Sequence, residues 1–126
     1  MINGTHLLLY SDDPEADRAF FRDVLKFPAV DAGGGWLIFK LPRAEAGIHP
    51  SEGHDKQAHG GRNLAGAVLY LMCDDLNSVI QSLKAKNVSC SPIETAEWGA
   101  KTTILLPSGG EIGLYQPRHP TALDLD

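Results

Sequence analysis

The pattern of hydrophobic and polar positions opens with a strand-like segment, residues 5–10, whose centre is apolar. Residues 11–14 read Ser-Asp-Asp-Pro, in which an aspartate is suited to cap a helix and the proline to occupy its first position. Apolar residues then recur at helical spacing: Ala16, Ala19, Phe20 and Val24. We predict a helix here that ends near Lys26, because Pro28 cannot continue it.

Three short extended stretches, at 29–31, 36–41 and 44–49, follow this helix and are separated by glycine and proline residues. The same order returns in the second half, with a strand at 67–73, a helix that begins at 74–75, and extended stretches near 88, at 102–106 and at 111–115. The sequence therefore predicts an α+β fold of two βαβββ modules in one domain, residues 1–126. The modules are residues 1–49 and 67–117, and an exposed connection, residues 50–66, joins them.

Side chains that recur at a fixed offset support this internal duplication. An offset of 62 residues carries Asp12-Asp13 onto Asp74-Asp75, and the same offset carries Trp36 onto Trp98. An offset of 66 superimposes residues 45–49 on residues 111–115, so that a Glu-x-Gly-aliphatic-ring pattern occurs twice. We interpret both tryptophans as symmetric structural residues.

Successive residues of a strand point to opposite faces of the sheet, so each predicted strand divides into two sets. One set is uniformly apolar and suits a core beneath the helices: Leu7, Leu9, Ala46, Ile48, Leu69, Leu71, Ile112 and Leu114. The other set mixes polar and apolar groups: His6, Leu8, Tyr10, Glu45, Gly47, His49, Val68, Tyr70, Met72, Glu111, Gly113 and Tyr115. Its glycines clear space at mid-strand, so we expect a concave mixed sheet with a ligand pocket on this face and helices on the outer face.

Composition and charge narrow the function. The formal net charge is −5, and no stripe of lysine or arginine is present, which disfavours nucleic acid and anionic membranes as partners. The longest apolar runs have the length of strands, and the N-terminal residues lack the regions of a signal peptide, so we expect a cytoplasmic protein. Cys73 and Cys90 lack the spacing of a metal or redox motif and are interpreted as reduced thiols.

Three segments together resemble one family: residues 5–12 (THLLLYSD), residues 19–25 (AFFRDVL) and residues 107–117 (PSGGEIGLYQP). They are similar to the vicinal oxygen chelate superfamily, which includes glyoxalase I, bleomycin-resistance proteins, fosfomycin-resistance enzymes and extradiol dioxygenases. The resemblance covers nearly the whole chain apart from residues 50–66. It implies the paired βαβββ fold, a small-molecule ligand and a homodimer.

The resemblance also implies up to four metal ligands, one from the first and one from the last strand of each module. In this chain those positions hold His6, Gly47, Val68 and Gly113, so only one of the four carries a donor. A divalent ion at such a site needs about three protein donors, and we therefore expect the usual metal site to be absent. The alternative is a displaced divalent-metal site at His6, His49 and Glu111, which lie on the same predicted face.

Two function hypotheses follow for the mixed face. The first is a small-molecule binding protein without metal or other cofactor, whose ligand contacts His6, Tyr10, His49, Tyr70, Glu111 and Tyr115. The second is a metal-dependent enzyme, a glyoxalase-type lyase or an extradiol-type dioxygenase, that uses the displaced site with Glu45 as catalytic base. Against the second, Glu45 and Glu111 both begin strands, where solvated carboxylates are common. A purely structural or regulatory role is a third alternative.

Overall fold

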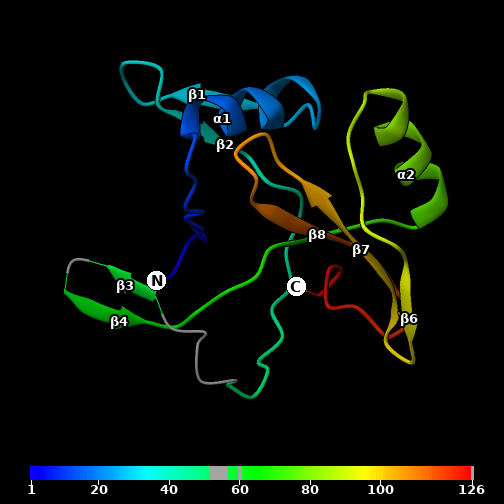
Figure 1. Ribbon diagram of the computed structural model, residues 1–126. Coiled ribbons are helices and arrows are strands. Elements are labelled where there is room, and N and C mark those ends of the chain that lie inside the picture. Colours follow the sequence, from blue (N-terminus) through cyan, green and yellow to red (C-terminus); the bar gives the residue numbers. More distant parts are fainter. Residues whose placement is uncertain (52–56, 60, 126) are drawn as a thin grey trace. The chain divides into compact units, whose positions relative to one another are not determined.

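The computed structural model describes residues 1–51, 57–59 and 61–125. It divides into two compact units, one formed by residues 1–41 with 105–110 and the other by residues 42–104 with 111–126. No helix in the described part of the chain is long and apolar enough to cross a membrane. Figure 1 shows the elements of each unit.

The first unit contains the helix α1 (Pro14–Asp23) and a hairpin of β1 (Ala29–Asp31) and β2 (Leu37–Phe39). Asp13 caps α1 as predicted, because its carboxylate accepts a hydrogen bond from the amide of Ala16 at 3.2 Å. Chain reversal after α1 uses Lys26 at a positive φ of 62°. The helix therefore ends a few residues earlier than the sequence suggests.

Phenylalanine side chains form the core of this unit. Phe20 and Phe21 are buried on α1, and the ring of Phe21 lies 5.8 Å from that of Phe27 and 5.5 Å from that of Phe39. Aromatic pairs of this kind contribute about 0.5–1.5 kcal/mol each beyond their burial. Beside this core, the guanidinium of Arg18 lies 4.6 Å from the ring centroid of Trp36.

Asp17 ties the turn after β7 to α1 within the same unit. Its carboxylate accepts hydrogen bonds from the hydroxyls of Ser11 at 2.6 Å and Ser108 at 2.7 Å, and from the amide of Ser108 at 3.1 Å. Helical spacing alone places Asp17 on the solvent face, but the residue is half-buried. The partner that explains this difference lies 91 residues away in sequence.

The second unit contains a mixed four-stranded sheet in the order β5-β8-β7-β6. Its strands are β5 (Tyr70–Met72), β6 (Glu94–Ala96), β7 (Gly99–Leu105) and β8 (Glu111–Pro117), and β5 runs parallel to β8. The helix α2 (Leu76–Ala85) follows β5, with Asp75 as its cap. The order of elements is the predicted βαβββ, although β6 lies at Glu94–Ala96 and not near residue 88, and the α+β fold class is confirmed.

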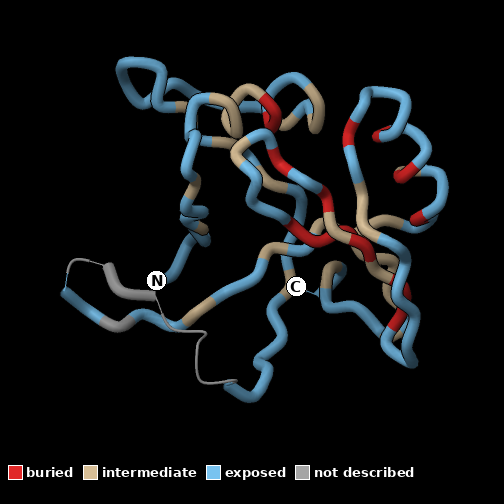
Figure 2. Tube along the Cα trace, in the orientation of Figure 1, coloured by how far each residue is buried: buried red, intermediate tan, exposed pale blue. Residues whose placement is uncertain are grey.

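The core of the second unit lies between α2 and one face of the sheet, where the red segments in Figure 2 mark buried residues. Leu76, Ile80 and Leu83 of α2 are buried, in agreement with the predicted apolar helix face. On β7 the residues Ala100, Thr102 and Ile104 are buried, and on β8 the buried apolar side chains are Ile112 and Leu114, with the buried Gly113 between them. The predicted parity is therefore confirmed for β8.

Three predicted extended stretches, residues 5–10, residues 44–49 and the stretch near 88, carry no strand in the structure. A strand needs a neighbour for its amide and carbonyl groups, and side-chain alternation alone does not supply one. The second segment instead meets the C-terminal residues, because Arg43 pairs with Asp124 at 2.5 Å and Glu45 accepts from the amide of Ala122 at 2.8 Å.

The connection, residues 50–66, contains a short antiparallel hairpin of β3 (Gln57–His59) and β4 (Arg62–Leu64) that the sequence pattern does not predict. Residues 52–56 and 60 of this connection lie outside the described residues.

Candidate functional site

An aromatic cluster lies on the sheet face opposite α2 in the second unit. We define the aromatic cluster as Tyr70, Trp98, Tyr115 and His119. The ring of Tyr115 is at its centre, with centroid distances of 5.8 Å to Tyr70, 5.9 Å to Trp98 and 5.7 Å to His119. Tyr70 and Trp98 keep 40% and 39% of their surface exposed, so the cluster presents ring faces as well as packing them.

The sheet itself positions these rings. Tyr70 of β5 is the register partner of Gly113 on β8, and Tyr115 is the partner of Met72. A β-carbon at position 113 would overlap the ring of Tyr70. Gly113 is therefore the surface on which the Tyr70 ring rests, and only glycine fits there without moving the ring.

Hydrogen bonds fix the orientation of Tyr115. Its hydroxyl is hydrogen-bonded to Nε2 of His119, and Nδ1 of His119 lies 2.7 Å from the carbonyl oxygen of Pro120. A carbonyl can only accept, so Nδ1 carries the proton in the neutral ring and Nε2 accepts from the tyrosine hydroxyl. The imidazole of His119 thus links the central ring, Tyr115, to the chain segment that follows β8.

A lysine reaches the edge of the aromatic cluster from β7. The ammonium of Lys101 lies 5.5 Å from the ring centroid of Trp98 and 5.9 Å from that of Tyr70. Its nitrogen is 3.6 Å from a carboxylate oxygen of Glu94, the register partner of Lys101 on β6. Cation and ring faces at these distances attract each other through the ring quadrupole.

A hollow of about 350 Å³ adjoins the cluster. It is lined by Ser91, Pro92, Glu94, Lys101, Thr102, Thr103 and Glu111. The buried hydroxyl of Thr102 donates to the carbonyl of Ser91 at 2.6 Å, and the hydroxyl of Ser91 accepts from the amide of Thr103 at 2.8 Å. These bonds hold one wall of the hollow, whose volume is at the lower end of the range for small-molecule sites.

A second hollow, of about 300 Å³, lies near the beginning of α2. It is lined by Arg43, Met72, Cys73, Asp74, Pro117, Thr121, Leu123 and Asp124. Burial raises the pKa of the Cys73 thiol, and the charges of Asp74 and Asp75 raise this pKa further. The thiol is therefore a poor nucleophile at neutral pH.

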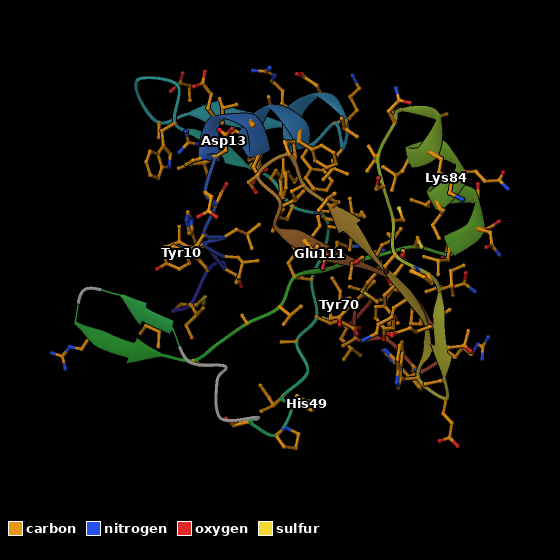
Figure 3. The ribbon with its side chains drawn as sticks, in the orientation of Figure 1. Tyr10, Asp13, His49, Tyr70, Lys84 and Glu111 are labelled. Carbon is orange, nitrogen blue, oxygen red and sulfur yellow. The ribbon has the colours of Figure 1, made fainter. Side chains whose placement is uncertain are left out.

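The structure brings together only part of the predicted site. Tyr70 and Tyr115 meet in the aromatic cluster, and Glu111 lines the adjoining hollow. Glu45 binds the amide of Ala122 instead of lining that hollow. His49 is exposed on the segment before the connection, and Figure 3 shows it apart from Glu111.

Two more predicted ligand contacts, His6 and Tyr10, lie in the first unit. Both are exposed, and Tyr10 keeps 62% of its surface accessible. They remain predictions, since they belong to a different unit from the aromatic cluster.

Three contributors to the aromatic cluster and its edge are not among the residues predicted to bind ligand. Trp98 is interpreted from sequence as structural, but it packs on Tyr115 and faces Lys101. Lys101 has a signal in the sequence, because the residues of 99–105 also alternate and place it opposite the buried Thr102. His119 has none, as it follows the last predicted strand.

The four positions at which the family resemblance implies metal ligands do not fit a metal ion. Val68 has no donor atom, and neither Gly47 nor Gly113 has a side chain. At position 113 the ring of Tyr70 also occupies the space that a donor side chain would need. In the part of the chain that the structure describes, no group of three or more His, Cys, Asp or Glu residues could hold a metal ion.

Comparisons with known proteins agree with this fold. The sequence model of the Glyoxalase/Bleomycin resistance protein/Dioxygenase superfamily matches residues 5–114. No curated protein matches the sequence.

The solved structures that are similar to this chain include the following three. A lactoylglutathione lyase from Agrobacterium tumefaciens is 19% identical with a TM-score of 0.61, over 90% of this chain and 92% of that one. The antibiotic-binding protein TnmS3 from Streptomyces sp. CB03234 is 20% identical with a TM-score of 0.54, over 93% and 99%. The fosfomycin resistance protein FosX from Listeria monocytogenes is 12% identical with a TM-score of 0.58, over 92% and 94%. At these identities the likeness concerns the fold, and the match of the family model over residues 5–114 carries the assignment: the chain belongs to the glyoxalase/bleomycin resistance protein/dioxygenase superfamily.

Proposed function

We propose that this protein binds a small organic molecule at the aromatic cluster and the adjoining hollow, without a metal ion. The observation that carries the proposal is the cluster itself, in which partly exposed rings surround a tyrosine fixed by His119. Rigid aromatic faces beside a few polar groups are typical of small-molecule sites. The same fold occurs in TnmS3, described as an antibiotic-binding protein, so the fold is compatible with this role.

The site is proposed to bind its ligand without a metal ion because three of the four implied ligand positions offer no donor side chain. Val68 and Gly113 replace two of the implied ligands in the second unit, and Tyr70 blocks the second of these positions. The displaced site lacks support as well, because His49 and Glu111 lie apart within the same unit. Proton transfer by Glu45 is equally unsupported, since its carboxylate is bound to Ala122.

A thermal-shift screen of a compound library tests the proposal, with protein purified both with and without a chelator. A ligand at 100 times its Kd stabilises the folded state by about 2.7 kcal/mol, which corresponds to about 10 °C in Tm for a chain of this size. We expect compounds that raise Tm equally with and without chelator. Tyr115→Leu removes the central ring and is expected to abolish these shifts.

Trp36→Phe is the matched control, because Trp36 pairs with Arg18 in the first unit, outside the aromatic cluster. It is expected to leave the ligand-induced shift unchanged. A library without any stabilising compound, shifts that disappear with chelator, or shifts that survive Tyr115→Leu would each overturn the proposal.

We also propose that the protein is a homodimer, as the family resemblance implies. Several large apolar side chains are exposed in the chain, among them Leu8 at 53%, Ile48 at 96% and Val68 at 74%. A contiguous apolar patch formed by such side chains would be typical of a protein interface. Sedimentation at increasing protein concentration tests the proposal, and a strict monomer at high concentration would contradict it.

A further inference from the structure

The ammonium of Lys101 is held at the aromatic cluster with unused hydrogen-bonding capacity. It faces the rings of Tyr70 and Trp98, and its side chain keeps 32% of its surface exposed. An ammonium has three N–H donors. Within the described chain, its one ionic partner is Glu94, whose oxygen at 3.6 Å lies beyond hydrogen-bond distance.

Glu94 is a weak partner for this lysine. Its side chain is 72% exposed, and ion pairs between exposed groups contribute little to stability. The carboxylate of a ligand could accept a hydrogen bond directly from the ammonium, beside the ring faces of Tyr70 and Trp98. Such a pair is stronger than the loose surface pair that it displaces.

The remaining acidic group of the adjoining hollow lies too far along the strand to neutralise this end. Glu111 begins β8 and precedes Tyr115 by four residues, which corresponds to about 13 Å along a strand. Of the charged residues that line the hollow, Glu111 therefore lies away from Tyr115, whereas Lys101 and its partner Glu94 lie together at the edge of the aromatic cluster. A cationic group placed at the aromatic cluster would be repelled by the fixed charge of Lys101.

The exposed ring faces define the other half of the ligand. The Tyr70 ring rests on the backbone of Gly113, and Trp98 lies in the turn between β6 and β7, where its ring packs against Tyr115. Flat aromatic groups gain most from such surfaces through offset stacking. An aliphatic ligand of equal area would lack this contribution.

We infer that the ligand of this site is a planar aromatic acid, whose ring packs on Tyr70 and Trp98 and whose carboxylate pairs with Lys101. The inference rests on the proposed function and gives it a ligand class. Lys101 is then the residue that selects for charge, and the aromatic cluster selects for shape. Glu94 acts as the competitor that an acidic ligand replaces.

Three isosteric probes test the inference by isothermal titration calorimetry: 2-naphthoate, 2-naphthamide and 2-naphthylmethylamine. We expect 2-naphthoate to bind at least about 10-fold more tightly than the neutral amide, and the amine to bind most weakly. The affinity for 2-naphthoate is expected to fall as salt rises, while the affinity for the amide stays constant. This comparison uses the unmodified protein and does not depend on the folding of a variant.

Substitutions then assign the effect to its residues. Lys101→Met is expected to remove the preference for 2-naphthoate and to leave binding of the amide within about 2-fold. Glu94→Gln is expected to strengthen 2-naphthoate binding by about 2- to 5-fold, because the competing carboxylate is gone. Lys84→Met is the matched control, since Lys84 lies on α2 and is expected to change neither affinity.

Equal affinity for 2-naphthoate and 2-naphthamide, tightest binding of the amine, or no binding of any probe would each overturn the inference. These outcomes are distinguishable from failure of the proposed function. If the library screen yields ligands that depend on Tyr115 but no naphthyl acid binds, the site stands and its ligand class is wrong. If no compound depends on Tyr115, both fail.

Discussion

The substitution Asp17→Ala is expected to destabilise the protein more than an ordinary surface substitution does, although the helical pattern places Asp17 on the surface. The carboxylate accepts three hydrogen bonds, two from Ser108 and one from Ser11. Hydrogen bonds to a charged group contribute about 1.5–3 kcal/mol each when they are shielded. Here they share one half-buried carboxylate and are not additive, so we expect a loss of about 2–3 kcal/mol in the free energy of unfolding.

Urea unfolding followed by far-ultraviolet circular dichroism, at a fixed protein concentration, measures this loss. A change of 1 kcal/mol corresponds to about 4 °C in Tm for a chain of this length, so the expected decrease is about 8–12 °C. Asp17→Asn keeps one acceptor oxygen and removes the charge. It is expected to show roughly half of the effect.

Glu15→Ala is the control for the charge at the beginning of α1. Glu15 lies in the same first helical turn, is exposed, and has no hydrogen bond or ion pair within the described chain. Loss of its interaction with the helix dipole should cost about 0.5 kcal/mol, partly offset by the helix propensity of alanine. If Asp17→Ala and Glu15→Ala cost the same, the hydrogen bonds to the turn contribute nothing and the reasoning is refuted.

Two further predictions concern the second unit. Gly113→Ala is expected to displace the Tyr70 ring and to lower the free energy of unfolding by about 1–3 kcal/mol. Gly47→Ala should lower it by less than about 0.5 kcal/mol, because no atom lies near the added β-carbon, and equal losses in thermal melts would contradict this packing. For Cys73, whose pKa is raised from 9.0 mainly by burial, alkylation by iodoacetamide in a Cys90→Ser variant is expected to keep accelerating above pH 9.0, and a plateau below that pH would contradict it. Because the pKa of the Cys73 thiol is higher in the folded than in the unfolded protein, the contribution of this thiol to the free energy of unfolding is fully present below pH 9.0. This contribution is lost as the pH rises through the folded pKa.

Local chemistry explains why much of the fold could be predicted. Asp13 and Asp75 each cap a helix because their carboxylates satisfy amides a few residues away, which is a property of adjacent sequence. The alternation of Ile112, Gly113 and Leu114 likewise places the apolar residues against α2 from spacing alone. These features depend on short-range geometry, which the sequence displays directly.

Features that depend on distant partners could not be predicted in the same way. Residues 44–49 alternate like a strand, yet Glu45 bonds to a segment 77 residues later. Strand parity predicts Tyr70 and Tyr115 on one face of the sheet, whereas it gives no signal for Trp98 and His119, which lie outside the predicted strands. His119 joins Tyr115 only because the chain after β8 turns back, and no periodicity signals that turn.

The composition of the first unit has a consequence for how the chain is made. Residues 1–41 are synthesised early and residues 105–110 late, so this unit cannot be completed until residues 105–110 have been synthesised. A ribosome adds about 5–20 residues per second, so the interval between these segments is on the order of several seconds. During that time Asp17 lacks its two hydrogen bonds from Ser108. The N-terminal unit is therefore complete only after nearly the whole chain has been synthesised.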